Sequence, residues 1–253
     1  MRDILDPGNR ELLTPFAWSE TLVAFDFDGT LAPIVPEPGR AAMRPLTRRL
    51  VTRVAALYPS VVISGRGLRD VTSRMRGVGL RGLVGSHGVE PWQATPRVSR
   101  RVAVWRGLFE QALGDEAGVV IEDKEFSLAV HVRHSRAKKR VYARLAQVVS
   151  GLEGARVTKG IEVVNIVPKD APHKGMALER ERSRLNCDTA IYVGDDETDE
   201  DVFALDQPGR LLSVRVGRKP GSKAEFFINS QIEIDTFLEI LVSLRTGTAS
   251  PHG

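Results

Sequence analysis

The chain has 253 residues, a mass of 27.8 kDa and a formal net charge of +4, because 36 Lys and Arg residues outnumber 32 Asp and Glu residues. Its 23 glycines and 14 prolines are too few for a collagen-like or low-complexity chain, and a 42% content of hydrophobic residues excludes general disorder. The longest apolar runs are far below the roughly 18 residues of a membrane span, and the acidic N-terminal segment lacks the apolar stretch of a secretory signal, so we expect no membrane association and a cytoplasmic location.

The first part of the chain alternates between buried-strand patterns and helix patterns. A nearly continuous apolar run at residues 21–27 predicts a strand that is covered on both faces. A helix is predicted at 44–57, followed by a strand at 61–63, a helix at 67–76 and a strand at 83–85. The apolar positions of the first helix recur at helical spacing: Leu46, Leu50, Val54 and Leu57. This βαβαβ order predicts a parallel sheet.

Between residues 93 and 171 the apolar residues of the strands alternate with polar ones. In residues 127–133 the alternation places Leu128, Val130 and Val132 on a packed face. Ser127, Ala129, His131 and Arg133 then lie on the opposite face, toward solvent or a ligand. The elements expected here are helices at 97–113 and 136–149 and strands at 119–124, 127–133, 155–158 and 162–167. They predict a small α+β domain.

This middle segment also holds the excess of positive charge, with 14 Lys and Arg residues against 9 Asp and Glu residues. Its densest basic run is Arg136-Ala137-Lys138-Lys139-Arg140, which is typical of a solvated helix face. The chain has no nucleic-acid-binding motif and no aromatic stacking pattern, so we expect no nucleic-acid partner.

From residue 173 the first pattern resumes and completes the sheet. The expected elements are a helix to about 185, a strand at 190–193, a helix at 199–205, a strand at 211–216 and a helix at 234–245. We therefore predict an α/β protein with a Rossmann-like parallel-sheet core, made of residues 1–92 and 172–253. Residues 93–171 form an inserted α+β domain.

Two acidic clusters stand at the carboxyl ends of predicted strands, where α/β sheets place their ligand sites. Asp26 and Asp28 follow the first strand, and Gly29 and Thr30 form a turn whose backbone N–H groups could meet an anion. The second cluster places six acids within seven residues: Asp195, Asp196, Glu197, Asp199, Glu200 and Asp201. So many carboxylates repel one another unless a cation binds, and their oxygens suit Mg²⁺. A metal held in this way suits phosphoryl chemistry.

Two further segments fall at the same edge of the predicted sheet. Ser64-Gly65-Arg66 ends the second strand and offers a hydroxyl and a backbone donor. Lys174 opens the helix after the insertion, so its ammonium group can face a phosphate.

In this order the motifs resemble those of haloacid dehalogenase superfamily phosphatases. The four segments are Asp26-Phe27-Asp28-Gly29-Thr30-Leu31, Ser64-Gly65-Arg66, Lys174-Gly175 and Gly194-Asp195-Asp196-Glu197-Thr198-Asp199-Glu200. Residues 85–90 and 122–133 additionally resemble trehalose-6-phosphate phosphatases, and the likeness spans about residues 20–245. The resemblance implies a superfamily core with the insertion as an α/β cap that determines substrate specificity.

The resemblance also implies roles for individual residues. Asp26 would be the nucleophile and form an aspartyl-phosphate, while Asp28 would be the general acid and base. Mg²⁺ would be held by the Asp26 carboxylate, the Asp28 carbonyl and Asp195, with Asp196 and Asp199 supporting the site. The phosphate-binding residues would be Gly29, Thr30, Ser64, Gly65 and Lys174. The sugar-binding residues would be Arg66, His87, Glu90, Glu122, Lys124, His131, Arg133 and Asn165.

One segment departs from the family pattern. Trehalose-6-phosphate phosphatases usually show a Glu-x-Arg-Pro segment before the motif lysine, whereas this chain has Asn165-Ile166-Val167-Pro168. Asn165 can still hydrogen-bond to a sugar hydroxyl, but it lacks the charge of a carboxylate.

The leading hypothesis is therefore a Mg²⁺-dependent phosphatase of trehalose 6-phosphate, a monomer linked metabolically to a trehalose-6-phosphate synthase. Alternatives are a phosphatase of another phosphorylated disaccharide or glycoside, of the sucrose-phosphate or mannosyl-phosphoglycerate type, and a phosphomutase. A non-catalytic sugar-phosphate sensor is the alternative from a different functional class.

Overall fold

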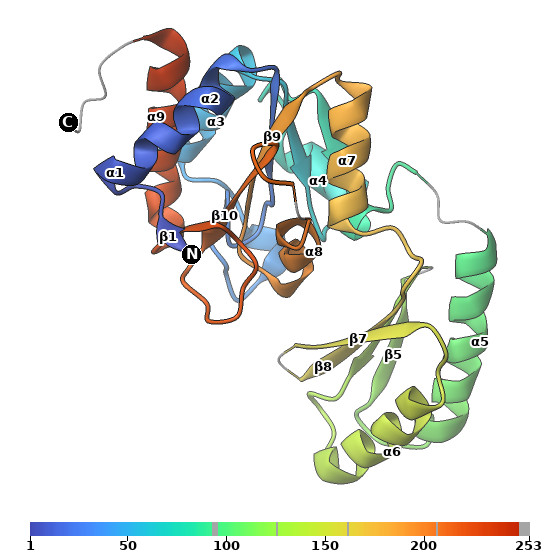
Figure 1. The fold of residues 1–253 in the computed structure, drawn as a ribbon. Coiled ribbons are helices and arrows are strands. Elements are labelled where there is room, and N and C mark those ends of the chain that lie inside the picture. Colours follow the sequence, from blue (N-terminus) through green and yellow to red (C-terminus); the bar gives the residue numbers. More distant parts are fainter. Residues whose placement is uncertain (93–95, 125, 161, 206, 248–253) are drawn as a thin grey trace. The chain divides into compact units, whose positions relative to one another are not determined.

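The chain divides into two compact units. The computed structural model describes residues 1–92, 96–124, 126–160, 162–205 and 207–247 (Figure 1). Unit 1 consists of Met1–Pro91 together with His173–Gly253, and unit 2 is the continuous segment Trp92–Pro172. None of the helices in these described residues is long and apolar enough to cross a membrane.

Unit 1 contains a seven-stranded sheet in the order β1-β11-β10-β9-β2-β3-β4, and every neighbouring pair is parallel. Its strands are β1 (Arg2–Asp3), β2 (Thr21–Phe25), β3 (Ser60–Ile63), β4 (Gly82–Val84), β9 (Thr189–Gly194), β10 (Leu211–Val216) and β11 (Phe226–Ile228). The predicted parallel sheet is confirmed. The strands β1 and β11 were not predicted, because their two and three residues are too few for a periodic signal.

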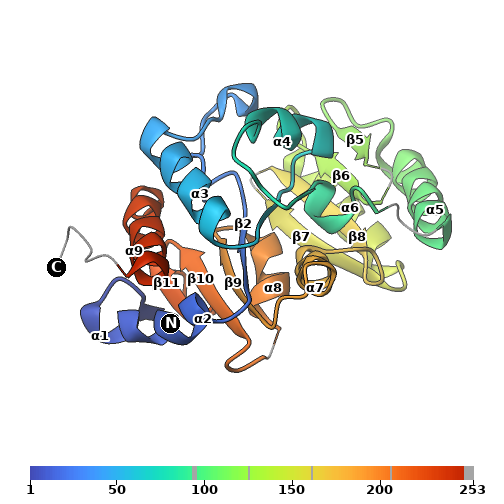
Figure 2. The ribbon, with the colours of Figure 1, turned by 90° about the horizontal axis from the view of Figure 1, so that it is seen from above.

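Helices cover both faces of this sheet. Figures 1 and 2 show α3 and α9 side by side on one face and α7 on the other. The α-helices of unit 1 are α1 (Pro7–Arg10), α2 (Thr14–Trp18), α3 (Pro45–Leu57), α4 (Leu68–Arg74), α7 (Lys174–Arg184), α8 (Glu200–Phe203) and α9 (Ile234–Thr246). Short 3₁₀ turns lie at Glu11–Leu13, Pro38–Arg40, Ser86–Gly88, Glu197–Asp199 and Gln231–Glu233.

The helix α3 shows how the sequence determines one of these elements. Pro45 takes the first helical position, where its missing N–H costs nothing. The helix ends before Tyr58, which is extended because Pro59 follows it. The predicted apolar stripe was partly wrong, since Leu46 is 39% exposed. The buried stripe is Thr47, Leu50, Val51 and Val54, the side that faces the rest of the core.

The core of unit 1 combines alternate strand residues with helix residues. Phe25 of β2 and Val193 of β9 are fully buried in one cluster with Val54 of α3 and Phe237 of α9. Each large apolar side chain that is fully buried contributes about 1.5–3 kcal/mol to the free energy of folding. This packing makes the sheet a rigid support for the residues at its strand ends.

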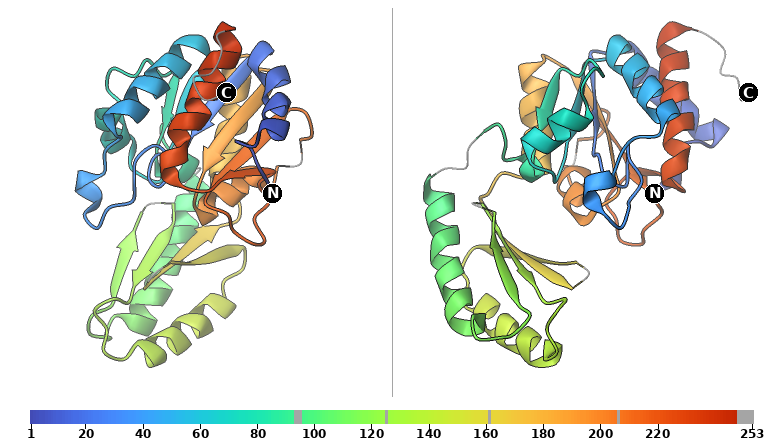
Figure 3. Two further views of the ribbon diagram at one scale, coloured as in Figure 1. Left: turned by 90° about the vertical axis from the view of Figure 1, so that its left-hand side faces the viewer. Right: turned by 180° about the vertical axis from the view of Figure 1, so that it is seen from behind.

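Unit 2 has a four-stranded antiparallel sheet in the order β5-β6-β8-β7. Its strands are β5 (Val120–Asp123), β6 (Leu128–His131), β7 (Ala155–Gly160) and β8 (Val163–Pro168), and its helices are α5 (Pro96–Leu113) and α6 (Lys138–Ser150). Figure 3 shows both helices on the same face of the sheet. The core between them includes Trp105 and Phe109 of α5 and Leu145 of α6.

The strand β6 follows the predicted alternation with two differences. Leu128, Val130 and Val132 are fully buried and His131 is half-buried, as the period of two predicts. Ala129 on the opposite face is also buried, and Arg133 lies beyond the end of the strand. The polar face is thus shorter than the sequence pattern indicated.

Candidate active site

The carboxyl ends of β2, β3 and β9 bring the predicted core motifs together. The strands β2 and β9 are neighbours in register, with Phe25 opposite Val193. The Asp26 N–H group continues the ladder by donating to the Val193 carbonyl at 2.9 Å. Asp26 and Asp195 therefore leave adjacent strands at the same edge of the sheet.

Lys174 joins the nucleophile candidate to the second acidic cluster. Its Nζ atom lies 3.0 Å from Asp26 Oδ1 and 2.7 Å from Asp199 Oδ1. All three side chains are almost completely buried. A buried lysine between two carboxylates is costly to desolvate but fixes their positions.

Both carboxylate oxygens of Asp199 accept hydrogen bonds from the protein. Its Oδ1 atom also accepts the Tyr192 hydroxyl at 2.6 Å. Its Oδ2 atom accepts the N–H groups of Asp195 at 2.9 Å and Asp196 at 2.7 Å. Asp199 thus shapes the loop that presents Asp195.

Two glycines make room for these carboxylates. A Cβ atom on Gly29, which has a φ of +78°, would lie 2.1 Å from Asp195 Oδ2. A Cβ atom on Gly194 would lie 2.3 Å from Asp199 Cγ. Only glycine therefore permits both loops to approach each other this closely.

The carboxylates of Asp26 and Asp195 have raised pKa values, because Lys174 only partly offsets the cost of burying their charges. Burial raises the pKa of Asp26 well above its ordinary value, although Lys174 opposes the change. Burial, assisted by the charge of Asp199, raises the pKa of Asp195 to about 7. Burial disfavours the Lys174 cation, but Asp199 and Asp26 outweigh that effect and raise its pKa. One ammonium group does not offset three clustered carboxylates.

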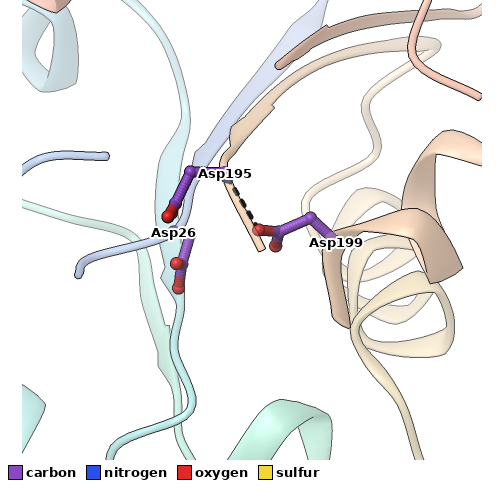
Figure 4. A group of neighbouring side chains, drawn as sticks. All are labelled: Asp26, Asp195 and Asp199. Carbon is purple, nitrogen blue, oxygen red and sulfur yellow. Dashed lines mark hydrogen bonds between the residues drawn. The ribbon is translucent and has the colours of Figure 1, made fainter. Parts of the chain in front are cut away.

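This donor set fits Mg²⁺. Ligand oxygens of Asp26, Asp195 and Asp199 lie within 4.8 Å of one another (Figure 4). Because Asp199 is occupied by Lys174 and by backbone amides, Asp26 and Asp195 are the carboxylates best able to ligate. Hard oxygen donors with surplus negative charge are what Mg²⁺ prefers.

Asp28 is held by Arg66, for which the sequence predicted a contact with the sugar. Arg66 Nε and Nη2 donate to the two carboxylate oxygens of Asp28, each at 2.6 Å. Arg66 thus serves the second aspartate of the first motif in this structure.

The candidate phosphate-binding residues are only partly available to an anion. The Thr30 hydroxyl donates to Asp195 at 3.1 Å, and Ser64 Oγ accepts the Arg66 N–H at 3.1 Å. The Gly29 N–H donates to the Ala32 carbonyl at 2.8 Å. The expectation that this amide is free was wrong, because the tight turn uses it internally.

A hollow of about 590 Å³ opens over these groups. Asp26, Asp28, Gly65, Arg66 and Lys174 belong to its lining, together with Asp195 and Asp196. Ile34 and Val35, from the loop after the first motif, add an apolar side. The hollow therefore combines the candidate nucleophile and the metal-ligand candidates Asp26 and Asp195 with four cationic side chains: Arg66, Lys174, Arg215 and Lys219.

His87 and Glu90, both predicted to read the sugar, have different positions. His87 lines the hollow, and its ring packs so closely on Gly65 that a Cβ there would lie 2.4 Å from His87 Cε1. The Glu90 Oε2 atom instead accepts the Leu68 N–H and the Ser86 hydroxyl, both at 2.7 Å. The Glu90 carboxylate thus fixes its own loop to the start of α4, and a contact between Glu90 and the sugar stays a prediction.

Arg215 was not among the residues predicted from the sequence. This buried side chain of β10 donates to the Asp196 carbonyl at 3.2 Å and to Glu200 Oε1 at 2.8 Å, and it also contacts the Asp195 carbonyl. It thereby stabilises the acidic loop. The signal that could have identified it is a single charged residue within the mostly apolar strand 211–216.

Most of the sugar-binding candidates in unit 2 share the sheet face opposite α5 and α6. His131 Nε2 lies 2.8 Å from Glu122 Oε2, and Lys124 Nζ lies 3.8 Å from the same oxygen. The register pairs Ala129 with both Glu122 and Asn165, which places Glu122 and Asn165 on this face in one row. Arg133 is not part of the group, because it pairs with Glu162 at 3.5 Å.

Solved structures with this fold include known phosphatase domains. The C-terminal domain of the Candida albicans trehalose-6-phosphate phosphatase aligns with a TM-score of 0.71 at 22% identity, over 93% of this chain and 98% of that one. A trehalose-6-phosphate phosphatase of Aspergillus fumigatus aligns with a TM-score of 0.69 at 22% identity, over 96% and 99%. At these identities the likeness establishes the shared fold alone, and the predicted α/β architecture with a parallel-sheet core is confirmed.

Curated relatives are more similar in sequence. A trehalose-phosphate phosphatase of Mycobacterium tuberculosis is 37% identical over 244 residues, which cover 87% of this chain and 60% of the relative. That of Mycobacterium avium is 36% identical over 214 residues, 77% of this chain and 53% of the relative. The chain thus spans 53–60% of the length of these two relatives. The trehalose-phosphatase family model matches residues 24–230, and this chain therefore belongs to that family.

Proposed function

We propose that this protein is a Mg²⁺-dependent phosphatase that hydrolyses trehalose 6-phosphate to trehalose and phosphate. The observation that carries the proposal is the position of Asp26 beside Lys174 and Asp195 in a hollow that Asp28 also lines. Membership of the trehalose-phosphatase family supports the substrate. The cytoplasmic location, the monomeric state and the metabolic link to a synthase stay predictions from the sequence.

In the first step a carboxylate oxygen of Asp26 attacks phosphorus. A bond forms between that oxygen and phosphorus while the bond to the sugar oxygen breaks, and Asp28 donates a proton to the departing oxygen. Lys174, buried between Asp26 and Asp199, keeps the attacking carboxylate oriented.

In the second step water hydrolyses the aspartyl-phosphate. Asp28 accepts a proton from the attacking water, the bond between Asp26 and phosphorus breaks, and inorganic phosphate leaves. Asp26 and Asp195 would hold Mg²⁺ with the carbonyl of Asp28. The ion would supply positive charge to the phosphoryl oxygens.

Unit 2 is proposed to be the cap that reads the sugar. Its sheet face carries Glu122, Lys124, His131 and Asn165, whose amide, imidazole and charged groups can hydrogen-bond to hydroxyls. The short distance between His131 and Glu122 supports this assignment, because the carboxylate fixes the imidazole orientation.

The test is phosphate release from a panel of substrates, with Mg²⁺ and again with EDTA. The panel contains trehalose 6-phosphate, sucrose 6-phosphate, mannosyl-3-phosphoglycerate and glucose 6-phosphate. We expect the highest kcat/KM for trehalose 6-phosphate and no turnover in EDTA. A higher kcat/KM for another member would refute the substrate, and turnover in EDTA would refute the metal dependence.

A further inference from the structure

One guanidinium group holds both carboxylate oxygens of Asp28. Arg66 Nε donates to Asp28 Oδ2 and Arg66 Nη2 donates to Asp28 Oδ1, each at 2.6 Å. The guanidinium is planar, so a bidentate pair fixes both the position and the plane of the carboxylate. The orientation of Asp28 therefore follows the orientation of Arg66.

Arg66 is in turn fixed by Asp70. The remaining terminal nitrogen, Nη1, donates to Asp70 Oδ2 at 2.7 Å. The side chain of Arg66 is 11% exposed and its Cζ atom lies 5.5 Å from the centroid of the Phe27 ring. All three nitrogens of the Arg66 guanidinium thus donate to the carboxylates of Asp28 and Asp70.

Asp70 is tied to the backbone beyond the hollow through a second arginine. Its Oδ1 atom accepts Arg74 Nε at 2.9 Å. Arg74 also donates to the Gly39 carbonyl at 3.2 Å and to the Ala41 carbonyl. The chain of contacts ends in the loop between β2 and α3.

Asp70 lies outside the hollow. Its side chain is 42% exposed, and it is not among the described residues that line the hollow. Ion pairs of this exposure add little to the free energy of unfolding. The series of contacts from Asp70 to Asp28 is therefore better explained by the position that it gives to Asp28.

We propose that Asp70 is a positioning residue for the reaction, which acts through Arg66 to hold Asp28 where it can exchange a proton with the sugar oxygen and with water. This assignment rests on the proposed phosphatase function. It names a residue outside the motifs that carry the chemistry.

The leaving group separates positioning of Asp28 from a general structural effect. A sugar alkoxide is a poor leaving group and needs a proton as the bond to phosphorus breaks, whereas p-nitrophenolate leaves without one. Misplacing Asp28 should thus slow the first step for trehalose 6-phosphate and leave the first step for p-nitrophenyl phosphate nearly unchanged. The second step, in which water attacks the aspartyl-phosphate, is the same for both substrates, so the first step is measured alone, in a single turnover.

The experiment compares Asp70→Asn and Asp70→Glu with the wild-type chain on both substrates. For Asp70→Asn we expect the release of trehalose in a single turnover to slow about tenfold, a fraction of the roughly 10²–10⁴ that general acid–base catalysis supplies. KM for trehalose 6-phosphate and the rate of p-nitrophenol release in a single turnover should stay within about twofold. Asp70→Glu, which keeps the carboxylate, should recover part of the loss.

Glu225→Gln is the matched control. It removes the carboxylate partner of Arg2, at 2.7 Å and 50% exposed, elsewhere in unit 1. We expect Glu225→Gln to leave the rates on both substrates unchanged. An Asp28→Asn/Asp70→Asn double variant should be no slower on trehalose 6-phosphate than Asp28→Asn alone, because Asp70 acts only through Asp28.

Equal losses of Asp70→Asn in the single-turnover release of trehalose and of p-nitrophenol would overturn the proposal. No loss in either, or a double variant whose loss is the sum of the two single losses, would overturn it as well. Failure of the phosphatase function gives a different result, since the wild-type chain would then release no phosphate from trehalose 6-phosphate.

Discussion

At the residue scale, the candidate site groups the carboxylates of Asp26, Asp195 and Asp199 around a single buried ammonium group, that of Lys174. Asp26 and Asp199 share the ammonium group of Lys174, while Asp195 has only the Thr30 hydroxyl among its side-chain hydrogen-bond donors in the described residues. Burial therefore raises the pKa values of Asp26 and Asp195. Such groups reduce the stability of the metal-free fold in exchange for reactivity.

Asp26→Asn should separate reactivity from stability. The amide is nearly isosteric but is not a nucleophile, so turnover of trehalose 6-phosphate should be lost. Because burial raises the pKa of Asp26, the folded chain favours its neutral form, and a neutral amide should stabilise the metal-free protein. We expect a gain of about 1 kcal/mol, or roughly 2–4 °C in Tm, by thermal unfolding in EDTA. A turnover near that of the wild-type chain would rule out Asp26 as the nucleophile.

The stability of the metal-free protein should fall as the pH rises toward neutrality. Asp195 has a pKa of about 7 in the folded chain against an ordinary value of 3.8, so the folded state binds its proton more tightly than the unfolded state does. Its stabilising effect is complete below the ordinary value and is lost as the pH rises to about 7. Mg²⁺ needs the ionised form, so it should raise Tm more at about pH 8 than at about pH 5.5. Equal Mg²⁺-induced shifts at both pH values would contradict this account.

At the element scale, the loop between β9 and α8 is held by a residue of the next strand. Arg215 of β10 contacts two loop carbonyls and Glu200, and Asp199 accepts two N–H groups of the same loop. The strand ends supply the positions of Asp26 and Asp195, and these contacts supply the shape of the loop. Metal binding should thus depend on a side chain that does not ligate.

Replacing Arg215 by Met should loosen the acidic loop. The change leaves the Glu200 carboxylate and two carbonyls without this donor, which costs about 1–3 kcal/mol of stability. We expect the Mg²⁺ concentration for half-maximal activity to rise several-fold and the Mg²⁺-induced shift in Tm to shrink. Arg2→Met, which removes an exposed ion pair to Glu225, is the control and should leave both measurements unchanged. If Arg215→Met needs the same Mg²⁺ concentration and shows the same Mg²⁺-induced shift in Tm as the wild-type chain, the contacts of Arg215 are not needed for metal binding.

The sequence predicted the helices and strands better than the hydrogen-bond partners of the side chains at their ends. Buried parallel strands place Asp26 and Asp195 at one edge of the sheet by topology alone, and that arrangement was predictable. The partners of Arg66 and Glu90 were not predictable, because a charged side chain in a loop can pair with any of several tertiary neighbours. The spacing of residues along the chain does not predict which of these neighbours a side chain contacts.

At the scale of the whole molecule, the chain contains two cores that share no strand. All pairings of the four strands in unit 2 lie within Trp92–Pro172, and α5 and α6 close its core. Glu116, nearly buried, joins α6 through Arg140 at 2.7 Å and Arg144 at 2.7 Å. A continuous segment with its own core has the properties of an independent folding unit.

Residues 92–172 expressed alone should therefore fold. We expect a cooperative thermal transition and a mixed helix and strand signal by circular dichroism. The same segment with Val130→Asp, which places a charge in its core, should show neither. A segment that melts without cooperativity would mean that unit 2 depends on unit 1 for its structure.

The discontinuity of unit 1 has a consequence for a chain that leaves the ribosome from its N-terminus. The strand β2 pairs with β9 on one side, yet 163 residues (26–188) lie between Phe25 at the end of β2 and Thr189 at the start of β9. The whole of unit 2 lies in this interval. During synthesis β2 must expose that edge until β9 emerges, and unpaired edges are prone to wrong pairing. Asp195 directly follows β9, so the nascent chain completes its set of candidate metal ligands at the moment when β2 gains its second neighbouring strand.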